Sequence, residues 1–316
     1  MTTAAGYIGI DVAKATLAVG TSTHFLCEVK NTPIGHQELI KRLSTLTVTG
    51  VVLEATGVYG QAITEALMLA GYAVAVVQPG CVRHFALSEN LHAKTDAIDA
   101  MVIARFAESR KLRFAKKTPD ILVQLRALID RRDQIILMRV SEENHLEANR
   151  NTAVQKEIKT NIKRLEKQEK EYTKKIAATM AADQTLTAKR QILENESGIG
   201  THTAAVLLAH LPELGTVNRQ EIAALVGLAP YNRDSGTMRG KRTIYGGRKR
   251  LRRALYMAAL SAVRWSDWLK DMYAQLLKRG KCKSVARVAC ARKLIIRLNS
   301  LLAAAYKTTT ETTQPA

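Results

Sequence analysis

Three strand-like segments follow one another near the start of the chain, and the turns between them are too short to hold a helix. Their apolar and alternating patterns predict strands at 7–13, 15–21 and 25–30. The first segment contains YIGIDVAK, residues 7–14, and its apolar run ends in Asp11. A buried strand normally excludes such a charge, so Asp11 calls for either a turn or a functional explanation.

The pattern after these strands alternates between helix and strand. Helical spacing follows Pro33, and GVVLEAT at 50–56 reads as a buried strand. A helix at 59–71, a strand at 72–79 and helices from about residue 82 come next. Three strands, then helix, strand, helix, strand and helix, is the element order of the ribonuclease H-like (RuvC-like) fold, a mixed sheet with helices.

The middle of the chain has a different pattern. Residues 119–181 show sustained helical periodicity, many charges and no Gly or Pro after Pro119. A thin apolar stripe on a charged helix suits a helical hairpin or a coiled coil, acting as a spacer or dimerisation arm. We therefore predict an α/β plus α protein with four parts. They are a RuvC-like domain at 1–115, a long helical or coiled-coil segment at 116–184, a mostly helical C-terminal domain at 185–306 and a disordered tail at 307–316.

The net charge of +20 is concentrated outside the first third of the chain. Residues 1–110 carry a net charge of −1, and residues 111–316 carry +21. An excess this large indicates a polyanionic partner, most commonly nucleic acid. No apolar run is long enough to span a membrane, and the four cysteines form no CxxC pair. We expect a cytoplasmic, nucleoid-associated protein with no membrane partner.

Four acidic residues fall on elements that the predicted fold would bring together. Glu54 ends the apolar part of GVVLEAT, and Asp96 and Asp99 lie three apart on a predicted helix. In a ribonuclease H-like sheet, the strands that carry Asp11 and Glu54 are neighbours, and the helix packs across the same edge. Taken singly, each acid has an ordinary reading as a cap or a solvated side chain. Collected together, four carboxylates would repel one another unless cations held them, and oxygen ligands favour Mg²⁺ or Mn²⁺.

The segment ILENESGIGTHTAAVLLAHL predicts a helix-hairpin-helix. Gly198 and Gly200 would form a tight turn, and Thr201 would begin a helix with free N-terminal amides. Such a turn would contact the DNA backbone without reading the bases. A Gly-rich turn between two packed helices is an equally good interpretation.

A basic segment follows, and it surrounds a serine. Eight of the fifteen residues from 239 to 253 are basic and none is acidic, which suits binding to phosphates. Ser235 stands next to Gly236. It is either an ordinary loop serine or a nucleophile that attacks a phosphodiester, in which case nearby arginines would neutralise the phosphate. The candidate nucleic-acid ligands in and before this segment are Arg233, Arg239, Lys241, Arg242, Arg248, Lys249, Arg250, Arg252 and Arg253.

These blocks together resemble one known family. GIDVAK, LEATGVYG, KTDAIDAMVIARF, SGIG and GLAP…SG…RG…LRRALYMAA are similar, in this order, to insertion-sequence transposases with a RuvC-like Asp-Glu-Asp-Asp domain, which are related to the Piv DNA invertases. The resemblance covers nearly the whole chain and extends to bridge-RNA-guided recombinases.

The resemblance implies a site-specific DNA recombinase. Asp11, Glu54, Asp96 and Asp99 would hold Mg²⁺, and Ser235 would form a phosphoserine link to DNA. It also implies an element-encoded guide RNA, a C-terminal transposase domain and assembly as a dimer or tetramer. Two alternatives stay open: a RuvC-like Holliday-junction resolvase or nuclease that uses metal-activated water, and a nucleic-acid-binding architectural protein with a degenerate acidic site.

Overall fold

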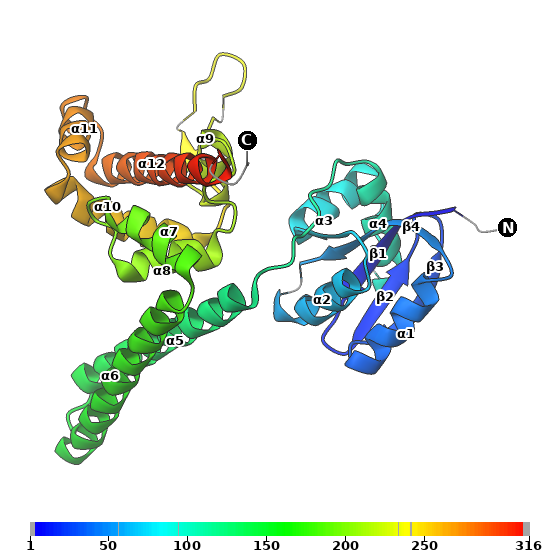
Figure 1. The fold of residues 1–316 in the computed structure, drawn as a ribbon, viewed down its shortest axis with the longest axis horizontal. Helices are drawn as coiled ribbons and strands as arrows, with labels where there is room; N and C mark the ends of the chain where they lie inside the picture. Colours follow the sequence, from blue (N-terminus) through cyan, green and yellow to red (C-terminus); the bar gives the residue numbers. More distant parts are fainter. Residues whose placement is uncertain (1–3, 56, 94, 233, 241, 312–316) are drawn as a thin grey trace. The chain divides into compact units, whose positions relative to one another are not determined.

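The chain folds into two compact units, Met1–Thr118 and Pro119–Ala316. The computed structural model describes residues 4–55, 57–93, 95–232, 234–240 and 242–311. Figure 1 shows the elements of both units.

The first unit is built on a five-stranded mixed sheet with the order β3-β2-β1-β4-β5. The first three strands form an antiparallel meander, and β1, β4 and β5 run parallel to one another. All five strands agree with the sequence prediction, although β1 and β4 begin three residues earlier than expected. The strands are β1 (Ala4–Val12), β2 (Thr16–Gly20), β3 (Phe25–Lys30), β4 (Thr47–Glu54) and β5 (Val74–Val77).

Helices cover both faces of this sheet (Figure 1). One face packs its fully buried Ile8, Ile10 and Leu53 against α1 and α2, and the other packs Val52 and Ala75 against α3 and α4. The central residues of β1 and β4 are buried on both sides of the sheet, which explains their continuous apolar runs. The helices are α1 (Pro33–Leu43), α2 (Gln61–Leu69), α3 (Pro79–Ser88) and α4 (Asp96–Glu108), with a 3₁₀ turn at Gly57–Gly60.

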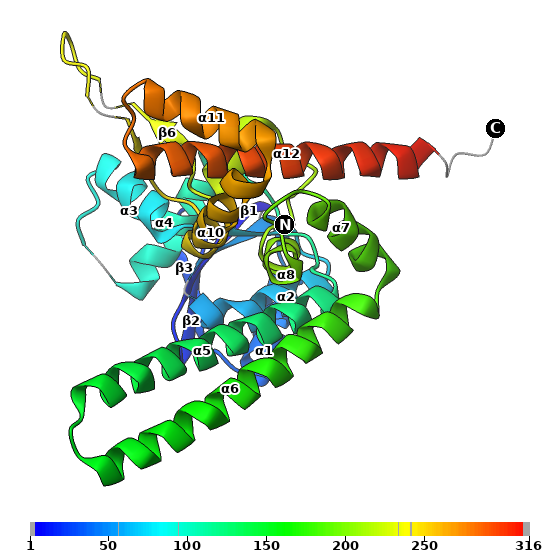
Figure 2. The ribbon, with the colours of Figure 1, turned by 90° about the vertical axis from the view of Figure 1, so that its left-hand side faces the viewer.

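The second unit begins with a helical hairpin, α5 (Asp120–Ala148) and α6 (Thr152–Ala181). Both views show the two helices side by side along their length (Figures 1 and 2). The apolar stripe predicted on the second helix faces the interior, since Leu165 and Ile176 are buried. The helices are interrupted at residues 149–151, where the Asn151 side chain accepts hydrogen bonds from the first amides of α6. The helical hairpin is confirmed, and a coiled coil stays a prediction.

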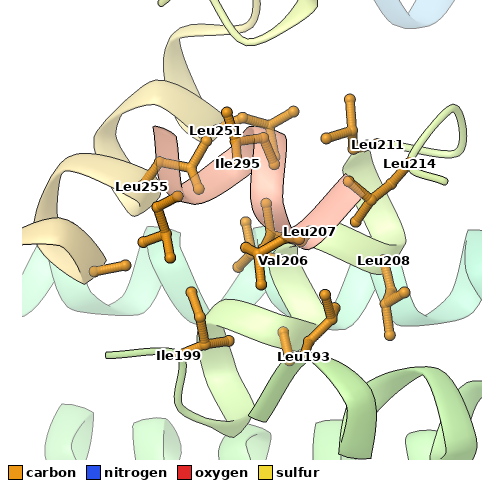
Figure 3. Packing of buried hydrophobic residues seen from close by; sticks show 14 of the residues in the cluster. Leu193, Ile199, Val206, Leu207, Leu208, Leu211, Leu214, Leu251, Leu255 and Ile295 are labelled. Atoms are coloured by element: carbon orange, nitrogen blue, oxygen red, sulfur yellow. The ribbon is translucent and has the colours of Figure 1, made fainter. Parts of the chain in front are cut away.

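The rest of the second unit is mostly helical, as expected, around one apolar core (Figure 3). Leu207 of α8, Leu251 and Leu255 of α10 and Ile295 of α12 meet there, all fully buried. A short two-stranded ribbon that the sequence analysis did not predict interrupts the helices. The elements are α7 (Gln184–Glu194), α8 (Thr201–His210), α9 (Arg219–Leu225), β6 (Pro230–Tyr231), β7 (Thr243–Ile244), α10 (Lys249–Trp265), α11 (Asp267–Lys278) and α12 (Lys283–Glu311).

The last helix differs from the expectation for the tail. The sequence predicts a disordered tail from residue 307, but helix α12 continues to Glu311. Residues 312–316 lie outside the described part of the chain.

Candidate functional site

Asp11 and Glu54 lie at the ends of neighbouring parallel strands. The register pairs Ile10 of β1 with Leu53 of β4, so Asp11 and Glu54 occupy the next position on each strand. Successive side chains alternate between the faces of a sheet. Ile10 and Leu53 are buried against α1 and α2, so both carboxylates lie on the opposite face, where α4 packs. Both residues are half-buried.

Helix α4 crosses this face unusually closely, and Gly9 permits the approach. A Cβ atom on Gly9 would lie 2.1 Å from the carbonyl oxygen of Ala100 and 2.6 Å from the amide nitrogen of Ala104. Gly20 pairs with Gly9 across β1 and β2, and a Cβ there would lie 3.1 Å from Cγ of Met101. Two glycines paired across neighbouring strands therefore form the surface against which α4 packs.

The direction of α4 decides where its two acids lie. Ala100, near the start of the helix, packs against Gly9. Glu108, its last residue, packs against Gly6, where Oε1 of Glu108 lies 3.0 Å from the position that a Cβ on Gly6 would take. The helix thus runs antiparallel to β1, and its N-terminal turn lies toward the end of β1 that carries Asp11. That turn contains Asp96, which is exposed, and Asp99, which is half-buried.

The fold therefore brings the elements that carry the four predicted acids to one end of one face of the sheet. Within the described residues, however, no three or more His, Cys, Asp or Glu side chains are grouped closely enough to hold a metal ion. The two acids on α4 also have a structural effect, since negative charge in the first turn of a helix is stabilised by the helix dipole.

Ser235 lies in the second unit, near the tip of an exposed hairpin. Strands β6 and β7 pair antiparallel, and an isolated bridge joins Ser235 to Met238 beyond them. Gly236 has φ of +55°, and its position in the turn favours glycine because side chains rarely adopt this conformation. The amide of Gly240 donates a hydrogen bond to Oδ1 of Asp234 over 3.0 Å. The hairpin projects from the helices of its unit as the yellow loop (Figures 1 and 2).

Two of the predicted phosphate-binding arginines are ion-paired within the protein. Arg248 donates two hydrogen bonds to the carboxylate of Glu213, over 2.6 and 2.5 Å. Arg250 pairs with Asp130 and, over 2.6 Å, with Asp133 on α5. These arginines fix the start of α10 against the loop that follows α8 and against α5. Their role in packing was not predicted from the sequence.

The other basic candidates divide into internal and exposed groups. Arg252 donates hydrogen bonds to the carbonyl oxygens of Gly227 and Gly246, over 3.3 and 2.8 Å. Arg233 and Lys241 lie outside the described residues. The exposed candidates are Arg239, Arg242, Lys249 and Arg253.

The predicted turn between α7 and α8 is present, and its two glycines have different surroundings. Gly198 has φ of +89°, and a Cβ on it would lie 2.6 Å from the carbonyl oxygen of Ala258 on α10. Gly200 and Thr201 are exposed, and a Cβ on Gly200 would meet no atom within 4 Å. Gly198 therefore has a packing role, whereas the space beside Gly200 at the start of α8 is open. The helix-hairpin-helix stays a prediction.

Polar contacts at the base of the helical hairpin were missed from the sequence. Arg132 of α5 donates to Glu169 and Thr173 of α6, over 3.0 and 2.9 Å, and lies 3.2 Å from Nε2 of His202 on α8. Only the register of α5 against α6 and α8 reveals this network, because its members are 37 to 70 residues apart in sequence.

The comparisons with known proteins cover both units. Residues 8–153 match the transposase family model of the IS110 Asp-Glu-Asp-Asp type. Residues 190–274 match the model described as "Transposase IS116/IS110/IS902 family". The chain belongs to this transposase family. It is therefore a DNA transposase or recombinase, an enzyme rather than an architectural protein.

Curated relatives agree with this family. The transposase is 26% identical over 301 residues to the pilin gene-inverting protein of Moraxella bovis, an alignment that covers 92% of this chain and 93% of that protein. The pilin gene-inverting protein of Moraxella lacunata matches to the same extent. An uncharacterized 43.6 kDa protein of insertion element IS110 from Streptomyces coelicolor is 32% identical over 114 residues, which cover 35% of this chain and 28% of that protein.

The T. thermophilus RuvC in complex with Holliday junction substrate aligns with 34% of this transposase and 98% of that chain, at 19% identity and a TM-score of 0.26.

No helix in the described residues is long and apolar enough to cross a membrane. The cytoplasmic, nucleoid-associated location stays a prediction.

Proposed function

We propose that this transposase cuts and rejoins DNA at specific sites through a covalent link to Ser235. Attack of its Oγ on a phosphorus atom would form a serine phosphodiester and break the bond to a deoxyribose oxygen, which leaves as a hydroxyl after taking a proton. Attack by a second deoxyribose hydroxyl would reverse the step and return the proton to serine. The phosphoester bond is conserved throughout, so rejoining needs no ATP. The exposed hairpin that carries Ser235 is accessible to a duplex, which supports this role.

The observation that carries the proposal for the first unit is the antiparallel crossing of α4 over β1 at Gly9. It directs Asp11, Glu54, Asp96 and Asp99 to one end of the sheet, and these side chains offer only oxygen ligands. Such a donor set fits Mg²⁺, with Mn²⁺ as a substitute. When bound, the ion would neutralise the phosphate and stabilise charge on its oxygens. We propose that these four acids and Ser235 both take part in the strand-exchange reaction.

We assign the first unit to the ribonuclease H-like (RuvC-like) fold. The sheet order β3-β2-β1-β4-β5, with an antiparallel meander followed by parallel strands, supports the assignment. For the second unit we propose that α7, the turn at Gly198 and α8 bind DNA as a helix-hairpin-helix, and that the α5–α6 hairpin is a coiled-coil arm through which chains assemble as dimers or tetramers.

The nucleic-acid partners proposed are the ends of the insertion element, its target DNA and an element-encoded guide RNA. The net charge of +21 over residues 111–316 supports a large polyanionic partner. The exposed Arg239, Arg242, Lys249 and Arg253 are the cations that we expect to contact phosphates.

A denaturing-gel assay for a protein–DNA adduct tests this proposal. The substrate is a duplex spanning the joined ends of the element, with the flanking RNA and Mg²⁺. We expect an adduct with the unmodified protein and none with Ser235→Ala or Asp11→Asn. Ser261→Ala and Asp271→Asn are matched controls, because both residues are exposed on helices of the second unit. Cleaved DNA without an adduct would instead indicate a nuclease or junction resolvase that uses metal-activated water.

A further inference from the structure

An exposed methionine lies directly opposite Ser235 in the hairpin. Met238 is 63% exposed. The amide of Ser235 donates a hydrogen bond to the carbonyl oxygen of Met238 over 3.1 Å. The amide of Met238 donates one to the carbonyl oxygen of Ser235 over 3.0 Å. Two residues that exchange both hydrogen bonds are a directly paired position of an antiparallel ribbon.

This pairing fixes where the two side chains point. Directly opposite residues in an antiparallel pair project from the same face of the ribbon. The hydroxyl of Ser235 and the thioether of Met238 therefore lie side by side on one face. The turn between them is short and defined, with Gly236 at φ of +55° and only Thr237 to complete it. The relative position of the two side chains is thus set by the backbone.

The surroundings of Met238 select nucleic acid as its partner. Tyr231 and Tyr245 are 47% and 73% exposed at the base of the same hairpin, and Arg239 and Arg242 are exposed between them and the tip. Cations along the ribbon complement a phosphate backbone, and exposed rings offer stacking surfaces for bases. An exposed apolar side chain at a ribbon tip suits insertion between bases, as the apolar wedge residues of DNA-bending proteins do.

We propose that Met238 is a wedge that unstacks the base step next to the phosphate contacted by Ser235. The inference rests on the proposed function, because it takes DNA at Ser235 as the substrate. Unstacking would bend the backbone at that step and expose its phosphate to the serine hydroxyl. Met238 would thus be a positioning residue that acts on the substrate's conformation.

Base unstacking can be measured without any cleavage. We would use the full-length Ser235→Ala protein with a duplex spanning the joined element ends, its flanking RNA, and 2-aminopurine placed in turn at each position around the junction. We expect a several-fold rise in fluorescence at one step. Adding Met238→Gln should abolish the rise, because the side chain keeps its length but becomes polar, and Met238→Leu should retain most of it.

Met257→Gln is the matched control, since Met257 is 59% exposed and belongs to α10, not to the ribbon. An equal rise with Met238→Gln, or no rise at any position with the Ser235→Ala parent, would overturn the wedge. This readout is independent of the nucleophile: a Met238-dependent rise without any serine adduct in the unmodified protein would refute the covalent mechanism and leave the wedge standing. If Met238→Gln formed the adduct as well as the unmodified protein does, the wedge would be refuted and the covalent mechanism would stand.

Discussion

Gly9 of β1 and Ala100 of α4 are packed backbone against backbone, with room for no side chain between them. A Cβ on Gly9 would fall 2.1 Å from the Ala100 carbonyl oxygen. Because the obstacle is helix backbone, the strain cannot be relieved by a rotamer change. We expect Gly9→Ala to destabilise the first unit by about 3 kcal/mol and to displace the acidic end of α4 from Asp11.

Urea unfolding of the full chain measures this effect. Gly80→Ala is the control, because Gly80 lies in α3 where a Cβ would meet nothing within 4 Å. Equal midpoints for Gly9→Ala and the unmodified protein would show that α4 does not depend on this contact.

The basic residues at the start of α10 should separate into two functional groups. Arg250 is held by Asp130 and Asp133, so Arg250→Gln should lower stability by about 1–2 kcal/mol and remove the nearest cation from both acids. Arg253 is exposed, so Arg253→Gln should preserve stability, weaken DNA binding and reduce the salt slope of log K by about 1. Thermal unfolding and salt titrations of binding measure the two effects. Equal stability and equal DNA binding of the two variants would refute this division into a structural and a DNA-binding arginine.

Acid should destabilise the second unit through His210. Burial, with Arg126 and Arg248 nearby, lowers the pKa of His210 from 6.5 to about 4. The folded state thus binds this proton less readily than the unfolded state, so stability is complete above about pH 6.5 and falls as the pH drops toward 4. The loss is at most about 3 kcal/mol.

His210→Leu should flatten this part of the pH profile, whereas the matched change at the exposed His145 of α5 should not. Denaturant midpoints between pH 7 and pH 4 give the comparison. Parallel profiles for His210→Leu and the unmodified protein would show that another group carries the acid sensitivity.

Metal binding at the acidic end of the sheet should be visible as stabilisation. A ligand that binds only the folded state stabilises it by about 2.7 kcal/mol at a concentration near 100 times its Kd. We expect Mg²⁺ to raise the Tm of the unmodified protein and of Asp271→Asn, but not of Asp11→Asn or Glu54→Gln. A Mg²⁺ response that survives in both of the latter variants would place the ion elsewhere.

The sequence by itself determined the elements of the first unit. Side-chain alternation and apolar runs are local properties, and turns too short for a helix gave the three successive strands. It also determined that Asp11 and Glu54 end apolar strands, because a charge in such a run is visible without any partner.

Tertiary structure decided which of the marked residues remain available for function. The density of charge in 239–253 could not distinguish Arg250 from Arg253, because the partners of Arg250 lie more than a hundred residues away on α5. The ribbon that pairs Met238 with Ser235 is likewise hidden in a polar, glycine-containing stretch with no period. Periodicity reports which face of an element is buried, whereas long-range pairing depends on how the elements pack, and only the fold contains that information.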